Sequence, residues 1–203
     1  MVRKSKQIRK TNETAINLEL MIDGTGKATL DTGVGFFNHM LDAFTRHGLF
    51  NLNVTCQGDL HVDDHHTVED VGIVLGRAFR EALGDMSGMT RYATVSIPMD
   101  EAIAHVSVDI SGRPYLVFQV DGLKEKIGTF DTELVEEFFR GFVNHAGITL
   151  HIQVPYGKNS HHIVEAIFKG VGRSLRYATE IDRRVVGIPS TKGTLSFSNQ
   201  GGQ

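Results

Sequence analysis

The chain is poor in cysteine, tryptophan and proline. Its 203 residues include one cysteine, Cys56, no tryptophan and four prolines. A single cysteine excludes an internal disulfide and is typical of a reducing compartment. We expect Cys56 to be a small buried residue of a strand.

Long apolar runs and a charge excess are also missing. No stretch approaches the roughly 20 apolar residues that a membrane helix needs, and the basic N-terminus lacks the apolar core of a signal peptide. The formal net charge of −3 provides no positive field that would attract nucleic acid. We therefore expect a cytoplasmic protein with neither a membrane nor a nucleic-acid partner.

Histidine and glycine are abundant instead, with ten and 22 residues. The glycines predict many tight turns. Four of the histidines belong to two His-His-x-x-Glu motifs, which span residues 65–69 and 161–165. Each motif leads into apolar residues at helical spacing. Because each helical residue turns by about 100°, adjacent histidines diverge and the glutamate falls between them. One such segment can offer ligands to two metal ions.

The repetition makes metal binding the favoured interpretation of the motifs. One copy alone would more often be surface polar residues. Two copies with identical spacing are improbable by chance. Imidazole and carboxylate ligands suit Mn, Fe, Zn or Ni, and the lack of thiolate argues against a structural zinc site.

The surrounding sequence repeats as well. Residues 47–54 resemble residues 145–152, and the period is about 90 residues. We predict an α+β fold, an internally duplicated pair of β-β-α-β-α half-domains, 1–90 and 91–203, that form one compact unit. The helices should pack between two outer sheets.

Several local features are predicted within this plan. Residues 1–10 are polar and should be frayed. A turn at 23–26 should return the chain from one strand to the next. Gly48 suits a left-handed helix cap, and Asp131 should cap a helix over 132–144. The tail from Ile188 should be ordered near Ser190 to Lys192.

Alignment of the halves extends the set of metal ligands. Aligning His47 with His145 places His39, with one gap, opposite Glu137. Alone, His39 could equally be a core histidine, and Glu137 would be assigned to a solvated helix face. Each half then offers four candidates, and eight ligands suit two metals with positions left for a substrate. The candidates are His39, His65, His66, Glu69, Glu137, His161, His162 and Glu165.

These residues carry a resemblance to a known family. The segments concerned are Arg9–Thr14, Asp23–Gly26, Phe37–Asp42, His47–Phe50, Asp63–Asp70, Gly157–His162 and Ile188–Gly193. Over nearly its whole length the chain resembles the imidazoleglycerol-phosphate dehydratases of histidine biosynthesis. The family's metal ligands map onto the eight candidates. Many members have His at the position of Glu137 and Asp at that of Asn38.

The resemblance implies a lyase with two Mn²⁺ per active site. It would convert D-erythro-imidazole glycerol phosphate into imidazole acetol phosphate and water. If two metals bind the two ring nitrogens, the ring can become an imidazolate that expels the hydroxyl and leaves a diazafulvene-like intermediate. A base must then remove the neighbouring C–H proton.

Family positions also suggest roles for other side chains. Glu13 and Glu165 are acid/base candidates, Lys169 lies one turn after Glu165, and Asp100 could support the water. Lys169 could instead be a solvated lysine paired with Glu165. The phosphate-binding positions of the family correspond to Arg91, Arg113, Ser190 and Lys192. Any one of these alone would be interpreted as a surface charge.

The resemblance further implies a homo-oligomer, a 24-subunit cage with metal sites at subunit contacts. Two other functions use the same histidines. A dinuclear hydrolase would activate a water, but the Ser190–Lys192 segment argues against it. A metal-storing or metal-assembled structural protein would leave Glu13, Lys169 and the arginines unexplained.

Overall fold

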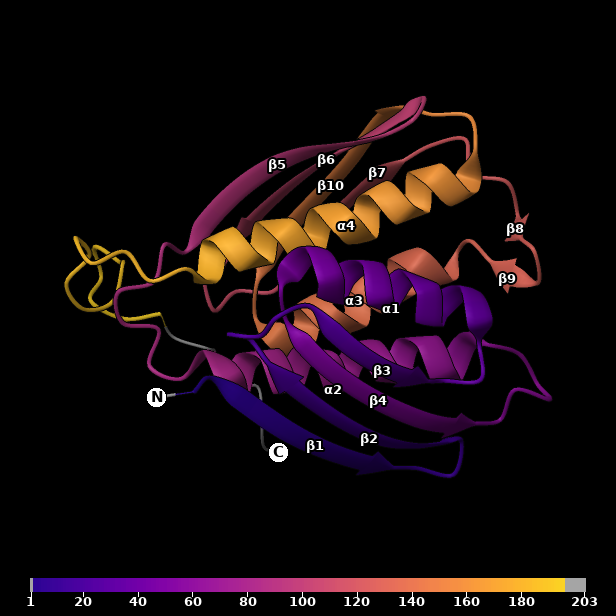
Figure 1. Cartoon of the computed structure of the whole chain (residues 1–203), viewed down its shortest axis with the longest axis horizontal. Helices are drawn as coiled ribbons and strands as arrows, with labels where there is room; N and C mark the ends of the chain where they lie inside the picture. The colour runs from indigo at the N-terminus through magenta and orange to yellow at the C-terminus, as the bar shows by residue number, and fades with distance from the viewer. Residues whose placement is uncertain (1, 196–203) are drawn as a thin grey trace.

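The computed structural model describes residues 2–195. It contains two four-stranded sheets and four helices, and the helices lie between the sheets (Figure 1). This confirms the predicted α+β class with its helical interior. No helix within residues 2–195 is long and apolar enough to cross a membrane.

The first sheet belongs to the N-terminal half of the chain. Its spatial order is β1-β2-β4-β3, made by β1 (Lys4–Lys10), β2 (Thr14–Met21), β4 (Asn51–Gly58) and β3 (Lys27–Asp31). β3 runs parallel to β4, whereas the other neighbours are antiparallel. Cys56 is buried in β4 as expected, and burial raises the pKa of its thiol to about 11.

The second sheet repeats this topology. Its order is β5-β6-β10-β7, made by β5 (Tyr92–Met99), β6 (Ala102–Asp109), β10 (Thr149–Tyr156) and β7 (Tyr115–Val120). β7 is parallel to β10, as β3 is to β4. The matching order and direction support the internal duplication. The division at residue 90 stays a prediction, and it falls between the last helix of one half and β5.

Four helices fill the space between the sheets. They are α1 (Gly35–Gly48), α2 (His65–Leu83), α3 (Leu134–Ala146) and α4 (Ser160–Thr179). α2 packs on β1 and β2, and α4 packs on β5 and β6. Across the interior, α1 packs against α4 and α2 packs against α3. Each half therefore contributes one helix to each pair.

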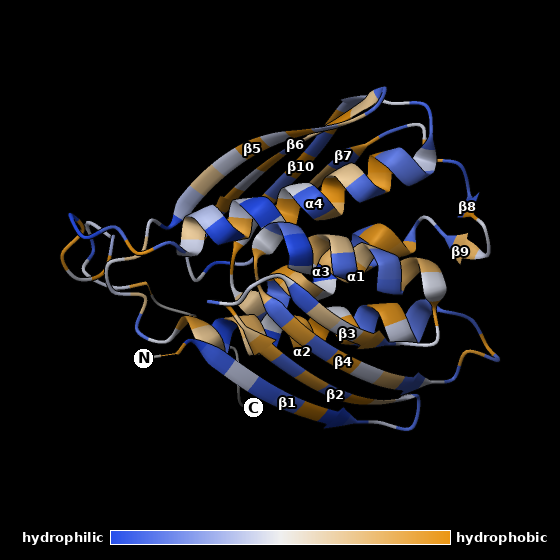
Figure 2. Cartoon of the chain, viewed as in Figure 1, coloured by the Kyte–Doolittle hydropathy of each residue, from blue (hydrophilic) through white to orange (hydrophobic). Residues whose placement is uncertain are grey.

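The core forms where these helices meet. Phenylalanine dominates it, and its fully buried members are Phe37, Phe44, Phe50, Phe79, Phe138, Phe139, Phe142 and Phe168. Each stabilises the fold by about 1.5–3 kcal/mol through apolar burial. Hydrophobic and hydrophilic residues alternate along strands and around helices in Figure 2, so each element presents one apolar face to this core.

The expectation of a frayed N-terminus was wrong. Residues 4–10 form β1, which pairs with β2 from Lys4↔Met21 to Lys10↔Ala15. The strand is polar because it lies at the sheet edge, and only Ser5 is buried. Lysines on an edge strand discourage pairing with other chains. Each half therefore reads β-β-β-α-β-α rather than β-β-α-β-α, with a small hairpin added before α3.

The chain returns as a strand, β3, after residues 23–26 as predicted, but that strand does not pair with β2. β2 and β3 are not neighbours, because β4 lies between them. Asn51 of β4 fixes the turn, since its Oδ1 accepts hydrogen bonds from the backbone N–H of Thr25 and of Lys27, at 2.8 and 3.2 Å.

Two helix ends differ from the predictions. Leu49, with φ of 53°, takes the left-handed position after α1. Gly48 is the last residue of the helix, and it is a glycine because the Phe50 ring lies where a Cβ would be. Asp131 belongs to the hairpin of β8 (Lys126–Ile127) and β9 (Phe130–Asp131), so α3 begins only at Leu134. Nearby tertiary contacts overrode the local signals.

Candidate metal centre and phosphate pocket

Three predicted ligands converge where α1 crosses α4. His39 Nε2 lies 3.5 Å from Glu165 Oε2, and His161 Nε2 lies 3.1 Å from the same oxygen. One donor atom from each of the three residues falls within 4.8 Å of the others. Two imidazoles and a carboxylate at this spacing could hold a divalent cation.

Lys169 completes this cluster from the next turn of α4. Its Nζ lies 2.7 Å from Glu165 Oε1, so the two residues form the ion pair considered above. The lysine is half-buried, because only 20% of its side chain is exposed. Burial acts to raise the pKa of Glu165, but the Lys169 hydrogen bond and nearby positive charge prevail and lower it. Glu165 is therefore held as a carboxylate.

The equivalent set in the other helix pair comes from α2 of the first half and α3 of the second. His65 Nε2 is 3.6 Å from Glu69 Oε2, which repeats the His161–Glu165 contact. Glu137 projects from α3, the helix that packs on α2, and lies 3.5 Å from Arg140 Nε. Within the described residues these three donors do not converge as tightly as His39, His161 and Glu165 do.

The second histidine of each motif has separate acidic neighbours. His66 Nδ1 lies 3.0 Å from Asp59 Oδ2, and its Nε2 lies 3.7 Å from Glu13 Oε1. The Asp59 hydrogen bond raises the pKa of His66. No local pattern in the sequence marked Asp59 as a histidine partner.

His162 repeats the arrangement with other residues. Its Nδ1 lies 2.8 Å from Glu101 Oε2, and its Nε2 lies 3.8 Å from Asp100 Oδ2. The hydrogen bond between Glu101 and His162 raises the pKa of His162. The same bond, together with hydrogen bonds from backbone N–H groups, lowers the pKa of Glu101 to about 2. Glu13 and Asp100 therefore occupy equivalent places beside the two Nε2 atoms. The sequence did not single out Glu101.

All four predicted phosphate-binding residues line one pocket. Arg91, Arg113, Ser190 and Lys192 surround it, together with Tyr92 and Ser111. The Arg91 side chain is nearly buried and already bonded to Asp109 and to the carbonyl oxygen of Pro189. Arg113 is 66% exposed, and its Nη2 makes only a long contact of 3.9 Å with Asp109 Oδ2, so its side chain can turn toward an anion. Asp109 is a further residue that the sequence analysis missed.

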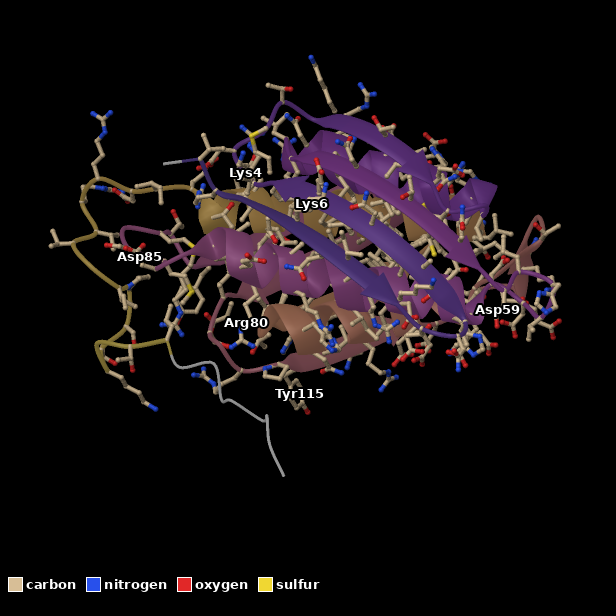
Figure 3. The ribbon with its side chains drawn as sticks, turned by 90° about the horizontal axis from the view of Figure 1, so that it is seen from below. Lys4, Lys6, Asp59, Arg80, Asp85 and Tyr115 are labelled. Atoms are coloured by element: carbon tan, nitrogen blue, oxygen red, sulfur yellow. The ribbon has the colours of Figure 1, made fainter. Side chains whose placement is uncertain are left out.

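The phosphate pocket and the histidine motifs lie at opposite ends of the molecule, as the two ends of α4 show. The Arg91 N–H donates to Ala178 near the end of α4, whereas His161 is at its beginning. At 1.5 Å per residue the two places are about 25 Å apart. In Figure 3, Asp59, the partner of His66, lies near one end of the molecule, and Asp85, just after α2, lies near the other.

Asn38 departs from the family pattern without disturbing the fold. Its Oδ1 accepts a hydrogen bond of 2.7 Å from the Thr32 hydroxyl and one of 3.2 Å from the Thr32 N–H. An aspartate could accept both. Asn38 therefore shapes the entry to α1, next to His39.

Comparison with known proteins identifies the family of the chain. The imidazoleglycerol-phosphate dehydratase family model matches residues 32–175. The enzyme of that name from Oceanobacillus iheyensis is 59% identical over 194 residues, covering 96% of this chain and 100% of the relative. The Agrobacterium fabrum enzyme is 58% identical over 195 residues, covering 96% and 98%.

Solved structures give the same result. The imidazoleglycerol-phosphate dehydratase of Staphylococcus aureus superposes with a TM-score of 0.80 at 47% identity, covering 88% of this chain and 99% of that one. The Pyrococcus furiosus protein, solved in complex with (S)-C348, has a TM-score of 0.80 at 39% identity, covering 93% and 100%. The chain therefore belongs to the imidazoleglycerol-phosphate dehydratase family of enzymes.

Proposed function

We propose that this chain dehydrates imidazole glycerol phosphate to imidazole acetol phosphate in histidine biosynthesis, with two Mn²⁺ per active site. The convergence of His39, His161 and Glu165 carries the metal part of the proposal. Family membership supports the substrate. The single cysteine supports the cytoplasm as its location.

The donor groups suit manganese. His39, His161 and Glu165 would hold one ion, while His65, Glu69 and Glu137 would hold the other. Each group leaves coordination positions open, and all donors are N or O. Bound Mn²⁺ would supply Lewis acidity at the two imidazole nitrogens of the substrate and hold the ring in place.

The acidic side chains would move the protons. Dehydration removes a hydroxyl from the carbon next to the ring and a proton from the neighbouring carbon. Glu13 and Glu165 are the carboxylates placed to accept the carbon-bound proton or to protonate the leaving oxygen. Asp100 would hydrogen-bond the departing water. Lys169 keeps Glu165 ionised through the 2.7 Å contact.

The positions of the residues support a site shared between subunits. The substrate measures roughly 9 Å from ring to phosphate, given bond lengths near 1.5 Å. It cannot span the distance of about 25 Å between the histidines and the phosphate pocket of one chain. A neighbouring copy would bring its pocket to the metal-binding end. His66 and His162 would complete the metal sites of neighbouring copies, in the 24-subunit cage that the family resemblance implies.

A dehydratase assay tests the proposal. Purified protein is stripped with a chelator, checked by elemental analysis and supplied with imidazole glycerol phosphate. We expect no imidazole acetol phosphate without metal and full recovery with Mn²⁺. Full activity of metal-free protein would overturn the metal dependence. Phosphate release without dehydration would indicate a hydrolase, and metal uptake without turnover would indicate storage.

A further inference from the structure

The Nδ1 atoms of His66 and His162 both contact carboxylates, yet the two halves supply these from unrelated places. Asp59 follows β4, whereas Glu101 lies in the turn between β5 and β6. The duplication therefore does not account for the match. The two halves reach one arrangement by different routes.

Among the described residues, the side-chain oxygens of Asp59 hydrogen-bond only to His66. Both of its oxygens lie near the ring, with Oδ1 at 3.2 Å and Oδ2 at 3.0 Å from Nδ1. Either oxygen can accept the Nδ1–H proton. Rotation of the Asp59 carboxylate by half a turn would leave the interaction unchanged.

Glu101 is fixed on both sides. Its Oε1 accepts hydrogen bonds from the backbone N–H groups of Lys158 and Asn159, at 3.0 and 2.7 Å. These bonds hold the loop that leads into α4. Its Oε2 faces His162 Nδ1 at 2.8 Å. The two carboxylate oxygens of Glu101 therefore have different partners. They cannot change places without breaking the hydrogen bonds to the backbone.

A carboxylate at Nδ1 decides which ring nitrogen carries the proton. A neutral histidine that donates from Nδ1 leaves Nε2 with a free lone pair, and only that lone pair can bind a metal. We propose that Asp59 and Glu101 are positioning residues that hold His66 and His162 in the tautomer with Nε2 free. The role of the two histidines as metal ligands rests on the proposed function, whereas their tautomer does not depend on it.

Because Asp59 and Glu101 differ in their hydrogen bonds, we expect amide substitutions at the two positions to have different effects on the histidine tautomer. In Glu101→Gln the amide oxygen stays with the two backbone N–H groups, so the amide nitrogen faces His162 and donates to Nδ1. His162 must then carry its proton on Nε2, which blocks metal binding. In Asp59→Asn the amide can rotate and present its oxygen, so His66 keeps its tautomer.

Ring ¹⁵N shifts of the metal-free full-length chain report the tautomer directly. They are recorded near pH 9, well above the ordinary histidine pKa, because Glu101 raises the pKa of His162, and the His162 signals are assigned by their loss in His162→Asn. We expect Nε2 of His162 to be unprotonated in the wild type and protonated in Glu101→Gln. A protonated Nε2 in the wild type, or an unaltered tautomer in the variant, would overturn the proposal.

Mn²⁺ titration provides the second readout. Glu101→Gln should weaken Mn²⁺ binding by about 10- to 100-fold and Asp59→Asn by only about threefold or less. Glu19→Gln, an exposed residue of β2 paired with Lys6, is the matched control and should bind as wild type. Equal losses in the two test variants would contradict the proposal. A wild-type chain that binds no Mn²⁺ would instead refute the proposed function, while the shifts still decide the tautomer.

Discussion

Arg91, which lines the candidate phosphate pocket, forms a two-point ion pair with Asp109. Arg91 Nε lies 2.7 Å from Asp109 Oδ1, and Nη2 lies 3.1 Å from Oδ2. Arg91 Nη1 also donates to the Pro189 carbonyl oxygen at 2.8 Å. The arginine thereby ties β6 to the segment that carries Ser190 and Lys192.

Asp109→Asn should therefore reduce both stability and substrate affinity. Removal of the carboxylate charge leaves a nearly buried guanidinium poorly compensated, which costs about 2 kcal/mol in the free energy of unfolding. KM should rise because Ser190 and Lys192 are held less firmly. Denaturant unfolding and steady-state kinetics measure the two effects.

Two comparisons sharpen this test. Arg113→Ala, at an exposed side chain, should raise KM at least about tenfold with little change in stability or metal content. Asp121→Asn, in the exposed loop after β7, should change neither quantity. If Asp109→Asn unfolds and turns over as the wild type does, the ion pair has no part in holding the pocket.

Mixing two inactive variants tests the shared site. His66→Ala and His162→Ala are each expected to lose activity, because each removes one ligand from every site. If the first half of one subunit meets the second half of another, dissociation, mixing and reassembly with Mn²⁺ should restore roughly a quarter of the sites (½ × ½). Dehydratase activity before and after reassembly measures the recovery. No recovery, or a fully active monomer in sedimentation, would exclude the shared site.

The helix pairs depend on glycines at their crossings. The abundance of glycine predicted turns, but Gly72 and Gly76 lie inside α2, facing the backbone of α3. A Cβ at Gly76 would lie 2.5 Å from the Phe142 carbonyl oxygen. Close approach of the two helices, rather than a turn, explains why residues 72 and 76 are glycines.

Gly76→Ala should accordingly destabilise the protein. Alanine favours a helix by about 1 kcal/mol over glycine, but overpacking against a backbone costs typically 1–3 kcal/mol. Gly35→Ala at the start of α1 has open space around it and serves as the control. Thermal unfolding should show a lower Tm for Gly76→Ala alone. A Tm equal to or above that of the control would mean that the helices can separate at no cost.

His145 should make the metal-free protein less stable in acid. Burial lowers its pKa, although its Nδ1–H donates to the Gly141 carbonyl oxygen at 2.9 Å. The unfolded chain then binds the proton more readily, so stability falls as pH drops below the ordinary value of about 6.5. His145→Gln should flatten the loss of Tm between about pH 7.5 and 5.5. An unchanged slope, or the same flattening in the exposed control His61→Gln, would contradict this assignment.

The sequence by itself determined the helices that carry the motifs and the class of the fold. Apolar residues at helical spacing placed α2 and α4 correctly, and Asn159 caps α4 by accepting the His161 N–H at 2.9 Å. Alternating apolar and polar residues indicated most of the strands of both sheets. These features depend on residues a few positions apart, which the printed sequence shows directly.

Only the tertiary structure decided the strand order and the grouping of the ligands. β4 separates β2 from β3, and the polar residues 4–10 become a strand because β2 offers them an edge. His39 meets His161 because α1 packs on α4. Asp59 and Glu101 lie beside histidines 7 and 61 positions away in the chain. Such contacts depend on how whole elements pack, and no local periodicity encodes them.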